Sequence, residues 1–106
     1  MAFTKKNYSY IDSAGLHFPD ASVGDSTYYA LDLACLVDLE QETILSITWE
    51  VPTGLSLVGS GVVIEKEAHV KITSNIPGVF RLKAIIESTD AGRTSTNTYY
   101  IILKVI

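Results

Sequence analysis

The C-terminal stretch of the chain, residues 76–106, reads IPGVFRLKAIIESTDAGRTSTNTYYIILKVI. Two apolar segments flank the turn-forming residues 89–93, so the stretch predicts a β-hairpin. Its second strand, about residues 96–106, is apolar on both faces, whereas ordinary surface strands alternate apolar and polar residues. One face carries Tyr99, Ile101, Leu103 and Val105, and the other carries Tyr100, Ile102 and Ile106. We therefore expect one face to fill the core, and the other to be covered by another molecule or by residues 1–26.

The same two-residue period predicts strands through most of the chain. TYYALDL at 27–33, ILSITWEV at 44–51, AHVKIT at 68–73 and VFRLKAIIE at 79–87 each have one apolar face. In the second segment, the apolar face holds Leu45, Ile47, Trp49 and Val51. In the third, Ala68, Val70 and Ile72 are expected to point inward, with His69 and Lys71 outward.

Glycines mark a further turn between LSLV at 55–58 and VVIE at 62–65. Gly59, Ser60 and Gly61 predict a three-residue hairpin loop. Strands then recur about every ten residues with no convincing helix, and residues 34–42 supply a helical turn or a loop. This spacing predicts an all-β, antiparallel β-sandwich of about seven strands. We expect Trp49, Phe80 and Leu82 in its core.

Residues 1–26 differ from the rest, because Gly15, Pro19 and Gly24 interrupt them and no period is sustained. We expect an irregular N-terminal arm with one short strand near residues 8–11. The aromatic residues of this arm are Phe3, Tyr8, Tyr10 and Phe18. Such residues are scarce in segments that never bury anything, so the arm is expected to dock on its own domain or on a neighbour. The chain thus divides into an arm, 1–26, and one β-sandwich domain, 27–106.

Composition narrows the classes of function. The 106 residues are 47% apolar and 19% charged, as in one globular domain. The net charge of −4 argues against a nucleic-acid partner, which would require clustered Lys and Arg. No apolar run reaches the roughly 20 residues of a membrane helix, and the N-terminus lacks the apolar part of a secretory signal. We expect a protein assembled in a cytosol, with neither nucleic acid nor membrane as a partner.

Residues for catalysis or metal binding do not converge. His17 and His69 lie far apart, and neither is followed by a second ligand at metal-site spacing. Glu65 and Glu67 share a strand face, which is typical of solvated carboxylates rather than of a glycosidase pair. No Gly-x-Ser-x-Gly elbow is present. We expect no enzyme activity, no cofactor and no metal.

Two motifs carry a resemblance to a known family. One is Trp-x-Val-Pro-x-Gly-Leu, with Trp49, Pro52 and Gly54, and the other is the Gly-Arg-Thr turn that begins at Gly92. With the strands around them, over residues 40–106, they resemble the small immunoglobulin-like proteins of tailed-phage virions. These are often labelled fibre–tail adaptor or capsid decoration proteins. Bacterial immunoglobulin-like domains share part of the pattern, usually as modules of long chains.

The resemblance implies an immunoglobulin-like sandwich and a non-enzymatic structural protein of the virion, assembled in the host cytoplasm. Such a protein would decorate or cement the capsid through contacts with other virion proteins and with copies of itself. The alternatives are a tail-fibre adaptor and a carbohydrate- or receptor-binding module, in which Tyr28, Tyr29 or Tyr100 would stack on sugar rings. We expect an interface formed by Phe3, Tyr8, Tyr10, Phe18, Tyr100, Ile102 and Ile106.

Overall fold

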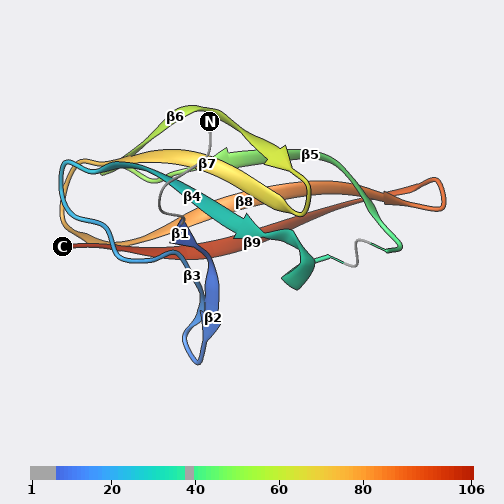
Figure 1. Cartoon of the computed structure of the whole chain (residues 1–106), viewed down its shortest axis with the longest axis horizontal. Helices are drawn as coiled ribbons and strands as arrows, with labels where there is room; N and C mark the ends of the chain where they lie inside the picture. The colour runs from blue at the N-terminus through green and yellow to red at the C-terminus, as the bar shows by residue number, and fades with distance from the viewer. Residues whose placement is uncertain (1–6, 38–39) are drawn as a thin grey trace.

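The computed structural model describes residues 7–37 and 40–106 (Figure 1). Almost all regular structure is β. The elements in chain order are β1 (Asn7–Tyr8), β2 (Tyr10–Asp12), β3 (Gly15–His17), β4 (Ser26–Asp32), a 3-10 turn η1 (Leu33–Cys35), β5 (Thr43–Glu50), β6 (Leu55–Ile64), β7 (Glu67–Ser74), β8 (Gly78–Asp90) and β9 (Arg93–Val105). No helix in the described ranges is long and apolar enough to cross a membrane.

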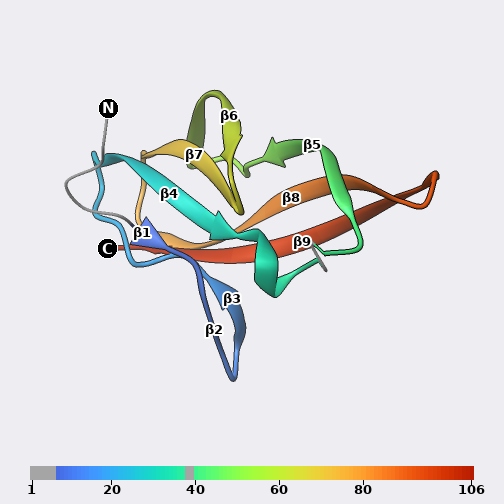
Figure 2. The ribbon, with the colours of Figure 1, turned by 45° about the vertical axis from the view of Figure 1, so that its right-hand side comes forward.

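The strands form two sheets that enclose a common core (Figures 1 and 2). The four-stranded sheet has the order β1-β4-β7-β6, and the five-stranded sheet has the order β2-β3-β9-β8-β5. The expectation of antiparallel sheets is wrong in two places. β1 runs parallel to β4, and β3 runs parallel to β9, so both sheets are mixed. Each parallel pair arises because residues 7–26 add strands to sheet edges formed by later parts of the chain.

The core is filled by apolar side chains that alternate along the strands and point inward from both sheets. Ala68, Val70 and Ile72 of β7 point inward, as predicted, and face the inner side of β8 and β9. Trp49 and Leu82 are buried and Phe80 packs against the core, in agreement with the sequence. Burying one large ring such as the Trp49 indole removes on the order of 200 Å² of surface from water.

The described part of the N-terminal arm is built into both sheets. Ser9 N–H donates to Ala30 O at 2.9 Å beside β4, and Phe18 N–H donates to Ile102 O at 2.9 Å beside β9. Farther along, Ala21 N–H donates to Lys104 O. The arm is therefore not irregular over residues 7–17, and it docks on its own domain, which was one of the two alternatives.

Phe18 has a different role from the one expected. It is 1% exposed and stacks on Tyr29 with ring centroids 4.9 Å apart, inside the core of its own chain. The interface role predicted for Phe18 is wrong, because the arm inserts this ring between the sheets. Burial also removes Tyr29 from the candidates for sugar stacking.

The predicted hairpin at Gly59-Ser60-Gly61 is wrong. β6 is one strand that continues from Leu55 to Ile64, and both of its halves pair with β7. The register shifts between Val58 and Val62, so the glycine segment is a bulge within the strand. The chain reverses instead at Glu65 and Lys66. The described residues between 27 and 106 consequently form six strands rather than about seven.

A second bulge changes the face of one side chain in β5. The register shifts between Ile44 and Ser46, which turns Leu45 outward, where it is 51% exposed, and lets Ile44 pack against the core. The inward orientation predicted for Leu45 is therefore wrong, whereas Ile47 and Trp49 beyond the bulge face inward as expected.

The C-terminal hairpin is confirmed. β8 and β9 pair over their whole length, and Ala91 and Gly92 form the turn between Asp90 and Arg93. Both turn residues have positive φ, 51° and 80°, as a type I′ turn requires. The outer ends of the two strands extend beyond the core to the tip of the molecule (Figure 1).

Candidate functional site

The described residues predicted to form one interface are distributed over four places. Tyr10, Tyr100 and Ile102 lie on the outer face of the five-stranded sheet, and Tyr8 lies on the outer face of the four-stranded sheet. Phe18 is in the core, Ile106 is exposed at the end of the chain, and Phe3 lies outside the described residues.

On the outer face of the five-stranded sheet, one side chain from each of four strands lies in a single row across the sheet. Cross-strand pairing places Tyr10 of β2 beside His17 of β3, His17 beside Ile102 of β9, and Ile102 beside Arg81 of β8. The next row pairs Tyr100 with Lys83. We call this surface the five-strand face: Tyr10, His17, Arg81, Lys83, Tyr100 and Ile102. The β2–β3 hairpin extends it beyond the sandwich edge (Figure 2).

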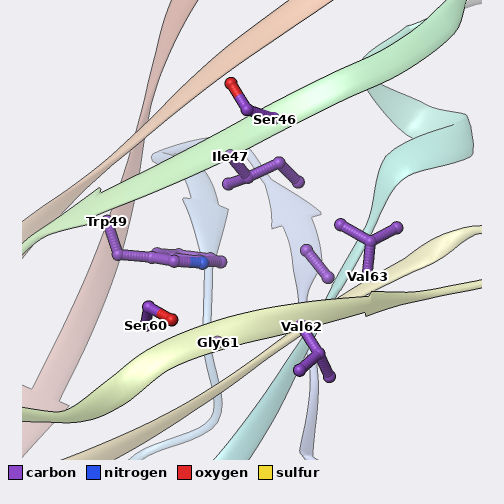
Figure 3. Close-up of a pocket in the computed structure, with 8 residues that line it drawn as sticks. Ser46, Ile47, Trp49, Ser60, Gly61, Val62 and Val63 are labelled. Carbon is purple, nitrogen blue, oxygen red and sulfur yellow. The ribbon is translucent and has the colours of Figure 1, made fainter.

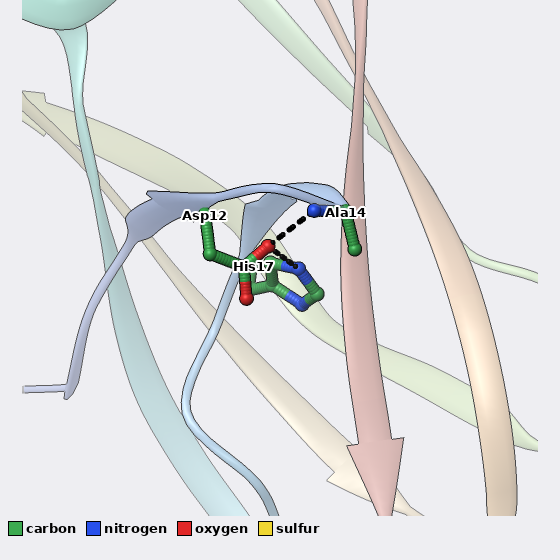
Figure 4. A network of polar contacts seen from close by, with 3 residues as sticks. All are labelled: Asp12, Ala14 and His17. Carbon is green, nitrogen blue, oxygen red and sulfur yellow. Dashed lines mark hydrogen bonds and ion pairs between the residues drawn. The ribbon is translucent and has the colours of Figure 1, made fainter.

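The hairpin at the margin of this face is ordered by one carboxylate (Figure 4). Asp12 Oδ1 accepts a hydrogen bond from Ala14 N–H at 2.8 Å and lies 2.8 Å from His17 Nε2. The Tyr10 ring stacks on His17, with centroids 5.2 Å apart and planes 11° apart. The hydrogen bond from Ala14 N–H, with a smaller contribution from His17, lowers the pKa of Asp12. The anionic carboxylate thus holds both the turn and the His17 ring.

Two cationic side chains lie beside Tyr100, which is at the centre of the five-strand face. The Arg81 guanidinium lies 5.5 Å from the Tyr100 ring centroid, and Lys83 Nζ lies 6.0 Å from it. Tyr100 is 48% exposed. Within the described ranges, neither cation forms an ion pair, and Lys104 nearby forms none either. The face is therefore a mixed aromatic and cationic surface on an acidic protein, suited to an acidic or carbonyl-rich partner surface.

The outer face of the four-stranded sheet is apolar, which sequence reasoning did not anticipate. Five large side chains are each between 40% and 57% exposed there. Register and alternation group them around His69, which is itself only 5% exposed. We call this surface the four-strand face: Tyr8, Tyr28, Val58, Val62 and Ile64 around His69. The signal available in the sequence is the segment SLVGSGVVIE, which lacks charge until Glu65, although its glycines predict a hairpin.

His69 faces outward as predicted, but neighbouring strands enclose it. Its Nε2 lies 3.0 Å from Glu67 Oε1, two residues away on the same face of β7. On the other side, Lys71 Nζ lies 5.2 Å from the Tyr28 ring centroid. The polar groups of this face therefore form one short line along β7, flanked by apolar side chains of β6 and by tyrosines.

A small pocket of about 260 Å³ opens between the edge strands β5 and β6 (Figure 3). Ile47 and Val63 point into it, and the Trp49 indole lies at its inner end, while Val62 points to the opposite side of β6. Trp49 is almost inaccessible to solvent, so it offers no ring face for stacking. The pocket is the gap where two sheet edges meet rather than a site with convergent polar groups.

No group of three His, Cys, Asp or Glu side chains within residues 7–37 and 40–106 is arranged to hold a metal ion. The chain matches no family model, no curated protein and no solved structure.

Proposed function

We propose that this protein is a non-enzymatic, immunoglobulin-like structural protein of a tailed-phage virion, which decorates or cements the capsid surface. The observation that carries the proposal is the five-strand face, a surface of aromatic and cationic side chains on which Tyr10 and Tyr100 remain exposed among the described residues. A tail-fibre adaptor would use the same face, and differs only in which virion protein lies opposite.

Strand order supports the immunoglobulin-like part of the proposal. Constant-type immunoglobulin domains have the strands A, B, E and D in one sheet and C, F and G in the other. The orders β1-β4-β7-β6 and β9-β8-β5 follow this scheme when β4 to β9 are taken as strands B to G. Trp49 lies on the strand that corresponds to C, which carries the buried tryptophan of immunoglobulin domains. With a single cysteine there is no inter-sheet disulfide, and Phe18 approaches the Trp49 ring instead, with centroids 6.2 Å apart.

The arrangement of the five-strand face supports attachment through this surface. Tyr100 supplies apolar area at the centre, and Arg81 and Lys83 beside it can pair with carboxylates of the virion protein opposite. The β2–β3 hairpin contributes Tyr10 at the margin of the same surface. Area buried between neighbouring subunits adds to the free energy that holds a shell together, so binding should raise the temperature at which particles disrupt.

The test uses phage particles from a genome that carries this gene, prepared with and without it. We expect the added protein to sediment with particles that lack it and to raise their disruption temperature. The double substitution Arg81→Glu, Lys83→Glu should abolish co-sedimentation, because it reverses the charge of the face. The control is Arg93→Glu, a single charge reversal at the distant hairpin tip, which should bind normally. Equal binding by both variants would contradict attachment through this face.

A second candidate function is carbohydrate binding, which the exposed Tyr100 ring between two hydrogen-bond-donating cations favours. Tyr28 cannot extend the same platform, since it lies on the opposite sheet. Retention of the isolated protein on immobilised glycans, lost in Tyr100→Ala and kept in Tyr28→Ala, would support this function. Binding to particles without binding to glycans would support the structural role instead.

A further inference from the structure

We propose that the four-strand face binds the same face of a second copy of this chain, forming a two-fold dimer in which the β7 strands run antiparallel. This inference does not depend on the virion role, and it concerns the opposite surface of the molecule from the five-strand face.

The apolar content of the face requires a cover. Tyr8, Tyr28, Val58, Val62 and Ile64 project from three strands of one sheet, and all are substantially exposed. Soluble monomers seldom group so much apolar surface, whereas interface centres contain aromatic and aliphatic side chains. Charged residues normally protect an edge strand from association, yet β6 carries none between Leu55 and Ile64.

The face is built of three rows that run across β4, β7 and β6. The first row is Tyr28, Lys71 and Val58, and the third row is Asp32, Glu67 and Ile64. Between them lies the row of Ala30, His69 and Val62. Tyr8 of β1 extends the middle row beside Ala30. The middle row is buried at Ala30 and His69, so contact with a partner falls on Tyr8, on Val62 and on the two outer rows.

These rows are complementary to themselves in one orientation. A two-fold axis that lies in the interface perpendicular to the strands places the first row of one copy opposite the third row of the other. Lys71 then faces Glu67 of the second copy, and Val58 faces Ile64, so that charges pair and apolar side chains meet. An axis parallel to the strands would instead place Lys71 opposite Lys71, and Glu67 opposite Glu67. Pairing of opposite charges thus favours the antiparallel arrangement. This arrangement also keeps the strands of the two sheets roughly aligned, as in most packed sheets.

The size of the face suits a weak dimer. Four strands about 4.8 Å apart, with the eight residues of β7 at about 3.3 Å each, give a face on the order of 500 Å². A standard interface takes roughly 800 Å² from each partner, so the smaller face is consistent with a concentration-dependent equilibrium between monomer and dimer. The two-fold arrangement also leaves both five-strand faces outward, on opposite sides of the dimer.

The experiment is sedimentation velocity of the full chain over a concentration series. We expect a monomer–dimer equilibrium, weakened by roughly tenfold or more in Val62→Glu, because two carboxylates would then meet at the two-fold axis. The matched control is Val79→Glu, which makes the same change at an exposed valine on the other sheet and should dimerise normally. Equal dimerisation of both variants would overturn the proposal, as would a wild-type chain that stays monomeric at high micromolar concentration.

Charge reversal tests the predicted orientation. Lys71→Glu alone and Glu67→Lys alone should each weaken the dimer, since like charges would face each other. The double variant Lys71→Glu, Glu67→Lys restores opposite charges across the axis and should recover association. Failure of the double variant to recover, in a protein whose circular dichroism and thermal unfolding match the wild type, would overturn the antiparallel arrangement.

A shortened chain that begins at Asn7 distinguishes between two possible covers of the face, a second copy of the chain and residues 1–6 of the same chain. If residues 1–6 of the same chain occupied the face, their removal would create or strengthen the dimer, which would overturn the proposal. An unchanged dimer supports it.

Discussion

The two sheets differ in whether their strands continue beyond the core. In the four-stranded sheet, the edge strand β6 bends at Gly59–Gly61 and returns to the same neighbour, so that both of its halves stay paired with β7. In the five-stranded sheet, two hairpins project beyond the core: β2–β3 at one edge and the tip of β8–β9 at one end (Figures 1 and 2). Both regions contain glycines at positive φ, yet Gly59 and Gly61 lie in a bulge whereas Gly92 lies in a hairpin turn.

The difference lies in which strand the residues after the glycines pair with. Val62 and Ile64 follow the β6 glycines and can pair with β7, so the chain continues forward and the extra residues become a bulge. After Gly92 comes a polar run, residues 93–98, all exposed, which gains nothing from the core and pairs back along β8. Local turn propensity permits a reversal, and the tertiary partners decide whether it occurs. We therefore expect substitutions in the four-stranded sheet to affect global stability more than those in the projecting hairpins.

The largest effect is expected for Gly61→Ala in the β6 bulge. A Cβ atom there would lie 2.7 Å from the His69 backbone oxygen and 3.2 Å from Trp49 Nε1, at a φ of +79°. Backbone cannot move aside as a flexible side chain can, so the free energy of unfolding should fall by about 3 kcal/mol. Urea denaturation measures this change. Gly59→Ala is the matched control, because its φ is +77° with open space around it. It should lose only about 1 kcal/mol; equal losses would contradict the close approach at Gly61.

Tyr29, on the inner side of β4, should make the protein sensitive to alkali. Burial, and secondarily the charge of Asp25, raises the pKa of Tyr29 to about 12. The folded state thus favours the neutral phenol more than the unfolded state does, for which the ordinary pKa is about 10. The stabilisation is complete below pH 10 and declines as the pH rises toward 12, by roughly 2 kcal/mol. Denaturant titrations at several pH values should show this decline in wild type and in Tyr28→Phe, and a smaller decline in Tyr29→Phe.

At the β8–β9 turn we expect smaller effects of opposite sign. Gly92→Ala places a side chain at a φ of +80° in open space and should cost about 1 kcal/mol. Ala91→Asn relieves the positive φ of a residue that disfavours it, and should gain about 0.5 kcal/mol. Thermal unfolding of the two variants against wild type measures both. A gain in both variants would contradict the type I′ geometry.

The smallest global effect is expected for Asp12→Asn in the β2–β3 hairpin. The free energy of unfolding should not change measurably, because Asp12 is exposed and the hairpin projects from the core. Hydrogen exchange at the Ala14 amide should nevertheless accelerate, since the anionic acceptor is lost. In wild type the same bond weakens as the pH falls through the lowered pKa of Asp12, below the usual value of 3.8. An unchanged exchange rate at Ala14 would contradict the role of this carboxylate in ordering the hairpin.

Much of the strand framework could be predicted from alternation, but the grouping of surface residues could not. Tyr8 and Tyr10 are two positions apart, yet they lie on opposite faces of the molecule, because the arm crosses from one sheet to the other between β1 and β2. Likewise, nothing in the local sequence indicates that Phe18 belongs to the core, since the partners that enclose it, Tyr29 and Trp49, are remote in the chain. The four-strand face is not evident in the sequence, because its apolar members come from three strands and the register of one of them, β6, depends on a bulge.

The amino-acid sequence alone determined the β character of this protein, the inward faces of β7, β8 and β9, and the turn that joins the last two strands. These depend on a period of two residues and on backbone conformations at single positions, which are local properties. The tertiary structure decided where the bulges of β5 and β6 fall, which sheet each part of the arm joins, and which side chains share a surface. Those outcomes depend on pairing between distant segments, in which one shifted residue moves a side chain from the core to the solvent.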